Sequence, residues 1–223
     1  MPKNNMRKFF FTLVVALLAW PSLMAEQRSE LYGQRASLFD MLGTDSTDIV
    51  FLGNSLIHGG NWAELLGNPN VVNRGINGDT ADGIDDRLES VLRGRPAKIF
   101  LICGANDVSH DLEADSIATA VIGLADRITA ESPSTKLYVM SLLPINNSFN
   151  RYRRLAGKEQ VIRDTNTALE SLCAARGLTW INLYPSFADA DGNLRTDLTN
   201  DGLHLLGPGY AIWTEIVKPY VEE

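Results

Sequence analysis

The chain has 223 residues, of which 45% are hydrophobic and 21% charged, with 27 acidic against 20 basic side chains. This length and composition suit one ordinary globular domain with a sizeable core. The formal net charge of −7 repels phosphate backbones, so we do not expect nucleic acid as a partner.

Residues 1–25 have the organisation of a secretory signal peptide. Basic residues open the segment, and the apolar run 9–20 is shorter than the roughly 20 residues that a membrane-spanning helix needs. Small residues precede a predicted cleavage site after Ala25. We therefore expect residues 26–223 to form a single periplasmic or secreted domain, without stable membrane insertion. The alternative is that the segment stays as a membrane anchor.

Beyond this segment, apolar runs alternate with helical patterns. The runs predict strands at residues 48–52, 70–73, 97–103, 136–142 and 178–182. Amphipathic spacing predicts helices at residues 31–42, 84–92, 117–128, 161–173 and 208–220. Strands that are apolar almost throughout and alternate with helices indicate a parallel sheet covered on both faces. The predicted fold is thus a three-layer α/β/α sandwich with a five-stranded parallel sheet.

Three polar or flexible residues follow the ends of the first three predicted strands. They are Ser55, Gly78 and Asn106. Ligands of open parallel sheets bind beyond the carboxyl ends of the strands, so we expect the three residues to meet at that edge. Taken singly, each has a plainer interpretation: a helix N-cap for Ser55, a turn for Gly78 and an Asx-turn for Asn106.

A fourth segment, Asp201-Gly202-Leu203-His204, lies just before the last predicted helix. Asp-x-x-His can hold a carboxylate near one imidazole nitrogen and leave the other free to take a proton from a serine. A surface turn with a capping aspartate is the alternative. His58 and His110 are competing bases; we expect His58 to line the pocket and His110 to face its rim or the solvent.

The chain resembles the SGNH hydrolases, the superfamily that includes the GDSL esterases and lipases. The resemblance is carried by four segments: Gly53-Asn54-Ser55-Leu56, Asn77-Gly78-Asp79-Thr80, Gly104-Ala105-Asn106-Asp107 and Asp201-Gly202-Leu203-His204. The resemblance spans about residues 48–207 and implies a flavodoxin-like α/β fold with no cofactor and no metal. Residues 48–56 also resemble bacterial esterases related to the platelet-activating-factor acetylhydrolase subunits. The implied site has a catalytic triad and three oxyanion donors: Ser55, His204 and Asp201, with the N–H groups of Ser55 and Gly78 and the amide of Asn106.

Two positions test how closely the chain follows this family. Asn54 stands where the family has aspartate before the serine, which leaves the nucleophile in place and affects only a local hydrogen bond. Gly75 competes with Gly78 as the donor glycine. Gly78 is preferred because the family's donor glycine directly precedes an Asp-Thr pair such as Asp79-Thr80.

The expected activity is that of an exported serine esterase acting on short-chain, chiefly acetyl, esters of a glycan or small molecule. Polar loops at residues 144–158 and 187–203 suit hydroxyl-rich or anionic leaving groups better than long acyl chains. The alternatives are a long-chain lipase or thioesterase of the same superfamily, and an inactive carbohydrate-binding scaffold. No oligomeric state is indicated.

Other residues allow more than one interpretation. The segment Arg151-Tyr152-Arg153-Arg154 is either a solvated loop or a pocket rim that contacts a polar or anionic substrate. Trp62 suits core packing better than stacking on a sugar. Cys103 and Cys173 are expected to be separately buried thiols, with a disulfide as the alternative. No spacing of metal ligands is present in the sequence.

Overall fold

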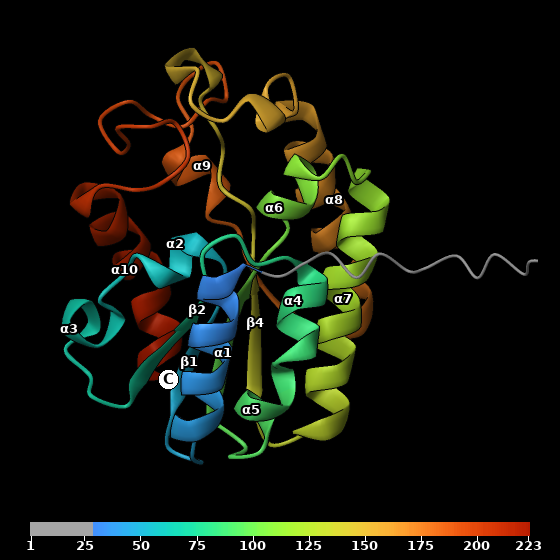
Figure 1. Cartoon of the computed structure of the whole chain (residues 1–223), viewed down its shortest axis with the longest axis vertical. Coiled ribbons are helices and arrows are strands. Elements are labelled where there is room, and N and C mark those ends of the chain that lie inside the picture. Colours follow the sequence, from blue (N-terminus) through green and yellow to red (C-terminus); the bar gives the residue numbers. More distant parts are fainter. Residues whose placement is uncertain (1–28) are drawn as a thin grey trace, which may run out of the picture.

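The computed structural model describes residues 29–223 as a parallel sheet with helices on both faces (Figure 1). The five strands lie in the order β2-β1-β3-β4-β5, and they are β1 (Ile49–Gly53), β2 (Val71–Gly75), β3 (Lys98–Ile102), β4 (Lys136–Met140) and β5 (Thr179–Ile181). The α/β fold predicted from the sequence is confirmed. The predicted signal peptide lies outside the described residues.

All five predicted strands are present, and their ends differ by at most two residues. The two-residue differences are at β2, which ends at Gly75 instead of residue 73, and at β4, which ends at Met140 instead of residue 142. The backbone N–H of Leu142 there donates to the side chain of Asn166 at 2.8 Å, so the ladder stops before it. Strands β1 and β3 are buried along their whole length, as expected for the central strands of a sheet covered on both faces.

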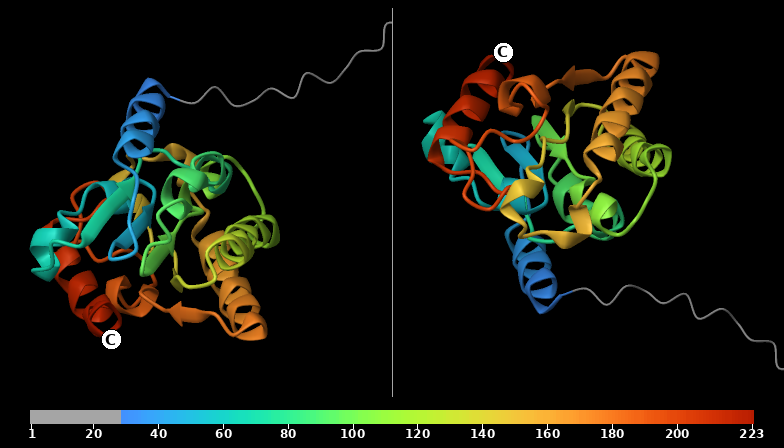
Figure 2. Two further views of the ribbon diagram at one scale, coloured as in Figure 1. Left: turned by 90° about the horizontal axis from the view of Figure 1, so that it is seen from below. Right: turned by 90° about the horizontal axis from the view of Figure 1, so that it is seen from above.

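Two hydrophobic cores lie on opposite faces of the sheet. Alternation along β1 sends Val50 and Leu52 into one core and Ile49 and Phe51 into the other. The first core is covered by α4 (Ala81–Asp86), α5 (Leu88–Leu92), α7 (Ala114–Glu131) and α8 (Glu159–Arg176). The second is covered by α2 (Ser55–His58), α3 (Trp62–Leu66), α9 (Tyr184–Phe187) and α10 (Gly207–Glu222) (Figure 2).

A row of stacked aromatic rings crosses the second core. Phe51, Phe100 and Tyr138 are register partners on β1, β3 and β4, and their ring centroids are 4.8 Å and 4.5 Å apart. Trp62 of α3 stacks on Phe51 at 4.4 Å and is 1% exposed. The structure thus confirms Trp62 as a core residue. Each such pair contributes about 0.5–1.5 kcal/mol beyond the burial of its area.

The helix predicted at residues 84–92 is in fact two short helices that meet at Arg87. The side chain of Arg87 is 3% exposed and turns inward to the carboxylate of Asp79, at 2.8 Å. The helix is interrupted at Arg87, where this charged side chain turns into the core. An apolar spacing alone gives no sign of that break, because Ile84, Leu88 and Val91 are all buried as the pattern requires.

Helix α1 (Glu30–Leu42) covers neither face of the sheet and stands out from the body of the molecule (Figure 2). Phe39 is its buried anchor, and the guanidinium groups of Arg35 and Arg74 lie 4.7 Å and 5.1 Å from the centre of the Phe39 ring. The predicted helix is present, but Leu42 is 59% exposed, so part of the predicted apolar face is solvated. Within residues 29–223, no helix is long and apolar enough to cross a membrane.

Candidate active site

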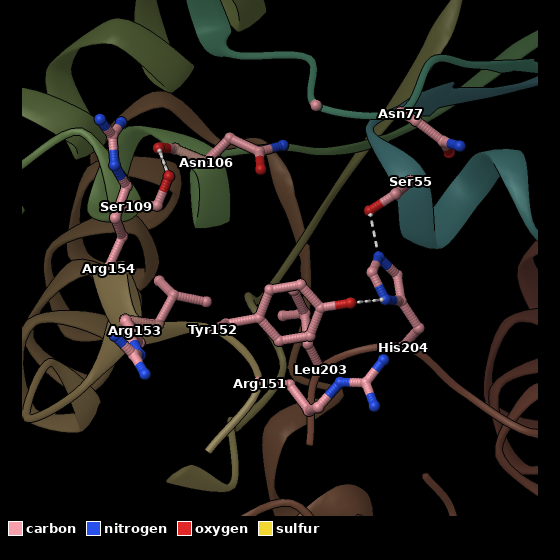
Figure 3. A pocket seen from close by; sticks show the side chains of 12 residues that line it. Ser55, Asn77, Asn106, Ser109, Arg151, Tyr152, Arg153, Arg154, Leu203 and His204 are labelled. Atoms are coloured by element: carbon pink, nitrogen blue, oxygen red, sulfur yellow. Dashed lines mark hydrogen bonds between the residues drawn. The ribbon is translucent and has the colours of Figure 1, made fainter. Parts of the chain in front are cut away.

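A pocket of about 550 Å³ opens at the carboxyl ends of the strands (Figure 3). Ser55 begins α2 directly after β1, Gly78 follows β2, and Asn106 lies in α6 (Ala105–Ser109) directly after β3. All three residues line the pocket, as does His204 from the segment before α10. The structure therefore brings together the residues that the sequence analysis placed at one edge of the sheet.

Ser55 is the first residue of α2 and does not cap it. Asn54 takes the N-cap position, and its side-chain oxygen accepts a hydrogen bond from the N–H of Leu56 at 3.1 Å. Gly53 before it has no room for a side chain, since a Cβ there would collide with the carbonyl oxygen of Ile102. The N-cap interpretation of Ser55 is therefore wrong, and its hydroxyl remains available to the pocket.

Ser55, His204 and Asp201 form a chain of hydrogen bonds. Ser55 Oγ lies 3.0 Å from His204 Nε2, and His204 Nδ1 lies 2.8 Å from Asp201 Oδ2. A carboxylate only accepts hydrogen bonds, so the proton of a neutral His204 sits on Nδ1 and Nε2 is the acceptor for the serine hydroxyl. This is the arrangement in which an imidazole can remove a proton from serine.

Asp201 is held as a carboxylate by several donors. Its Oδ1 accepts the N–H groups of Leu203 at 2.9 Å and His204 at 2.8 Å. Partial burial raises the pKa of Asp201, but the hydrogen bonds from His204, from these two amides and from Tyr152 outweigh it and hold the pKa well below its usual range. Gly202 makes the turn possible at φ +87°, where a Cβ would collide with the carbonyl of Asn146.

Asn106 lies across the pocket from His204 (Figure 3), and Gly78 also lines the pocket. Gly78 has φ +78°, a left-handed conformation that favours glycine. The amide nitrogen of Asn106 donates one hydrogen bond to the carbonyl of Asp79 at 2.8 Å, which fixes the side chain and leaves its second N–H free to donate. The site thus has a serine hydroxyl, an imidazole nitrogen that can accept its proton, and nearby hydrogen-bond donors.

The fold and this site agree with what comparison with known proteins shows. A model of the GDSL-like lipase/acylhydrolase family matches residues 51–212. The chain belongs to this family. The family makes it an acylhydrolase, that is, a carboxylic ester hydrolase.

Individual relatives have low sequence identity to this chain. The alpha2 subunit of platelet-activating factor acetylhydrolase IB from Homo sapiens is 28% identical over 182 residues, which are 78% of this chain and 75% of that protein. A GDSL-like lipase from Bacteroides thetaiotaomicron superposes with a TM-score of 0.75 at 24% identity, covering 86% of this chain and 97% of that one. An acetyl xylan esterase superposes with a TM-score of 0.66 at 18% identity, covering 78% and 99%. These two structures show the shared fold.

Tyr152 is a part of the acylhydrolase site that sequence reasoning missed. Its hydroxyl donates to Asp201 Oδ2 at 2.8 Å and lies 2.9 Å from His204 Nδ1. Burial first, and then the Asp201 carboxylate, raise the pKa of Tyr152 to about 12, so the phenol stays protonated and remains a donor. The only signal in the sequence was the segment Arg151–Arg154, which the structure places in the pocket wall.

The competing histidines lie elsewhere. His58, expected to line the pocket, is not among its lining residues, and its Nδ1 lies 3.2 Å from the carbonyl of Gly75. His110 ends α6 and is also outside the lining. Cys103 and Cys173 are buried and unpaired, as expected. Across the part of the chain that the structure describes, no cluster of three His, Cys, Asp or Glu side chains could hold a metal.

The Tyr152 contact leads to a prediction about pH. A neutral imidazole base makes kcat/KM rise through the range where histidines lose a proton, about pH 6–7. Tyr152→Phe removes a donor that competes with His204 for the Asp201 carboxylate. The protonated imidazole then interacts more strongly with Asp201, so the acid limb should move to higher pH. Because Asp201 also loses a contact that orients it, kcat should fall about 10- to 150-fold, the factor that corresponds to one hydrogen bond to a charged group.

The measurement is a pH profile of kcat/KM from pH 4 to 9 for wild type and variant. Tyr184→Phe is the matched control, because its hydroxyl donates to the carbonyl of Gly192 and does not line the pocket. An acid limb that stays in place or moves to lower pH in the Tyr152 variant would contradict the expected coupling.

Proposed function

We propose that this acylhydrolase is a serine esterase for short acyl groups, chiefly acetyl, on the hydroxyls of a carbohydrate. Ser55 is the nucleophile, His204 the base, and Asp201 orients His204. The N–H groups of Ser55 and Gly78 and the amide of Asn106 hold the oxyanion. The observation that supports these roles most is the hydrogen-bonded chain from Ser55 Oγ through His204 to Asp201, at 3.0 Å and 2.8 Å.

The reaction needs two similar steps. Ser55 Oγ attacks the ester carbonyl while His204 Nε2 takes its proton, and the oxyanion forms among the three donors. The carbon–oxygen bond to the alcohol then breaks, and His204 returns the proton to the departing oxygen. Water attacks the acyl-serine in the same way, which releases the acid and restores Ser55. Neither step requires a cofactor.

The residue types that line the pocket favour short acyl groups over long ones. A long-chain lipase gains about 0.8 kcal/mol for each methylene that it buries, which requires a continuous apolar surface. Here the large apolar side chains in the lining are Leu155 and Leu203, and most of the others are polar or charged. These observations weigh against the lipase alternative. The intact Ser55–His204–Asp201 chain weighs against an inactive binding scaffold, which has no need of it.

We also propose that the protein is exported and cleaved after Ala25. The support is the basic start and short apolar run in residues 1–25. N-terminal sequencing of protein recovered from its own host should give a chain that begins at Glu26, in the periplasm or the medium. A cytosolic chain that still begins at Met1 would rule out export by this route.

The catalytic roles predict a graded set of losses. Ser55→Ala and His204→Ala should each remove nearly all turnover, because the members of such a unit fail together. Asn106→Ala should lower kcat on the order of 10²–10³-fold, the usual cost of one oxyanion donor. Ser109→Ala, which also lines the pocket, provides a comparison for general disturbance of that wall.

Labelling by a fluorophosphonate probe separates the enzyme from the binding scaffold. The wild type should react covalently at Ser55, whereas Ser55→Ala should not react at all. Full turnover in either the serine or the histidine variant would mean that other residues are responsible for catalysis. A folded wild type that the probe leaves untouched would favour the scaffold.

The acyl preference is measured with p-nitrophenyl esters of two, four, eight and sixteen carbons, together with acetylated xylan. We expect kcat/KM to be highest for acetyl or butyryl and to fall for longer chains. The reason is that Leu155 and Leu203 are the aliphatic side chains that this lining offers to added methylenes. A value that climbs to the sixteen-carbon ester would support the long-chain lipase instead.

A further inference from the structure

The wall of the pocket has an unusual charge for this protein. The twelve lining residues include Arg151, Arg153 and Arg154 and no aspartate or glutamate. The chain as a whole has more acidic than basic residues, 27 against 20. A local cluster of one sign inside a pocket raises the local concentration of a ligand of the opposite sign. The reversal of sign at the pocket is therefore a property of the site and not of the whole surface.

These guanidinium groups are not paired with carboxylates of the protein, although Arg154 helps to lower the pKa of Asp111. None of the three forms an ion pair with any residue that the structure describes, residues 29–223. Two acids of the surrounding segments already have partners, since Asp111 pairs with Lys158 at 2.5 Å and Asp201 accepts hydrogen bonds from His204 and Tyr152. Arginines with a structural role are usually paired with a carboxylate or a carbonyl, as Arg87 is in the same protein.

Two of the arginines lie at opposite ends of the pocket, and one of them is close to His204. His204 returns a proton to the departing oxygen, so the alcohol lies beside His204 when it leaves. Arg151 extends beneath His204, while Arg154 extends past Ser109 at the other end of the pocket (Figure 3). Arg153 points away from Ser55 and His204 in the same view. The ring of Tyr152 lies between the two ends.

We propose that the preferred substrates are esters whose alcohol part is negatively charged, with its carboxylate or phosphate bound near His204 by Arg151 and attracted into the pocket by Arg154. This inference rests on the proposed esterase function and specifies its substrate class. Guanidinium groups match both kinds of anion through paired N–H donors. Both side chains are exposed, so each contact contributes roughly 1.5- to 5-fold, and two together roughly 2- to 30-fold in kcat/KM.

The experiment compares three acetyl esters of similar size. They are 4-acetoxybenzoate, 4-acetoxyphenyl phosphate and the neutral 4-acetoxybenzamide, each rate being divided by the hydroxide-catalysed rate of the same ester. We expect the ratio of kcat/KM for anionic over neutral ester to exceed one and to fall as salt is raised from 20 to 500 mM. The carboxylate and phosphate arms show which anion is preferred.

The double variant Arg151→Gln/Arg154→Gln should bring that ratio close to one. Arg176→Gln is the control for loss of a positive charge elsewhere, because it removes one guanidinium from an ion pair with Asp126 at the far end of α8 and should leave the ratio unchanged. A wild-type ratio of one or less would overturn the inference. A high ratio that survives in the double variant would overturn it equally, because other groups would then bind the anion.

Binding to Ser55→Ala separates this inference from the proposed function. The variant does not require turnover, so the dissociation constants of 4-acetoxybenzoate and 4-acetoxybenzamide can be compared directly by ligand-observed NMR. Tighter binding of the carboxylate, lost in the added Arg151→Gln/Arg154→Gln variant, supports the anion site even if no ester is hydrolysed. Equal binding of the two esters overturns it, even if all three are hydrolysed.

Discussion

The buried ion pair between Asp79 and Arg87 is the interaction on which the geometry of this site depends. Both side chains are almost fully buried, with 0% and 3% of their surface exposed. Arg87 also donates to the carbonyls of Gly53 and Arg74, at 3.2 Å and 2.9 Å, at the carboxyl ends of β1 and β2. One guanidinium thus joins the strand that precedes the serine to the loop that contains Gly78.

The loop that contains Gly78 and Asp79 also positions Asn106. The carbonyl of Asp79 accepts the amide of Asn106, so the ion pair also determines where that amide lies. Removing one partner of a buried pair leaves an uncompensated charge, which costs about 3–5 kcal/mol. Charges are expensive to bury, and their contacts here to Gly53, Arg74 and, through Asp79, to Asn106 are a structural reason for keeping them.

Much of this architecture could be predicted from local sequence. The apolar runs that form β1 and β3 are buried on both faces, which is why they are uninterrupted in the sequence. Parallel strands bring their carboxyl ends to one edge, so the positions of Ser55, Gly78 and Asn106 followed once the strands were known. The Asp201–His204 pair lies within one turn, and its contact is local as well.

The features that were missed depend on contacts between distant residues. Tyr152 and Asp201 are 49 positions apart, and no spacing rule relates a loop tyrosine to a later aspartate. The break at Arg87 has a similar cause, because the side chain leaves the helix to reach a buried carboxylate. Helix α1 was predicted correctly, but the burial of its apolar face was not. Its apolar residues fit a helical face, yet no element of the described chain covers Leu42.

The loop of residues 151–155 has two roles in one short segment, since it supplies both the hydroxyl at Asp201 and the wall of the pocket. In a family with one scaffold and many substrates, such loops are where specificity diverges. Here a loop rebuilt for a new substrate must still provide a donor to the aspartate. Grafting this loop onto a relative would therefore transfer the pocket wall and the donor to the aspartate as one unit.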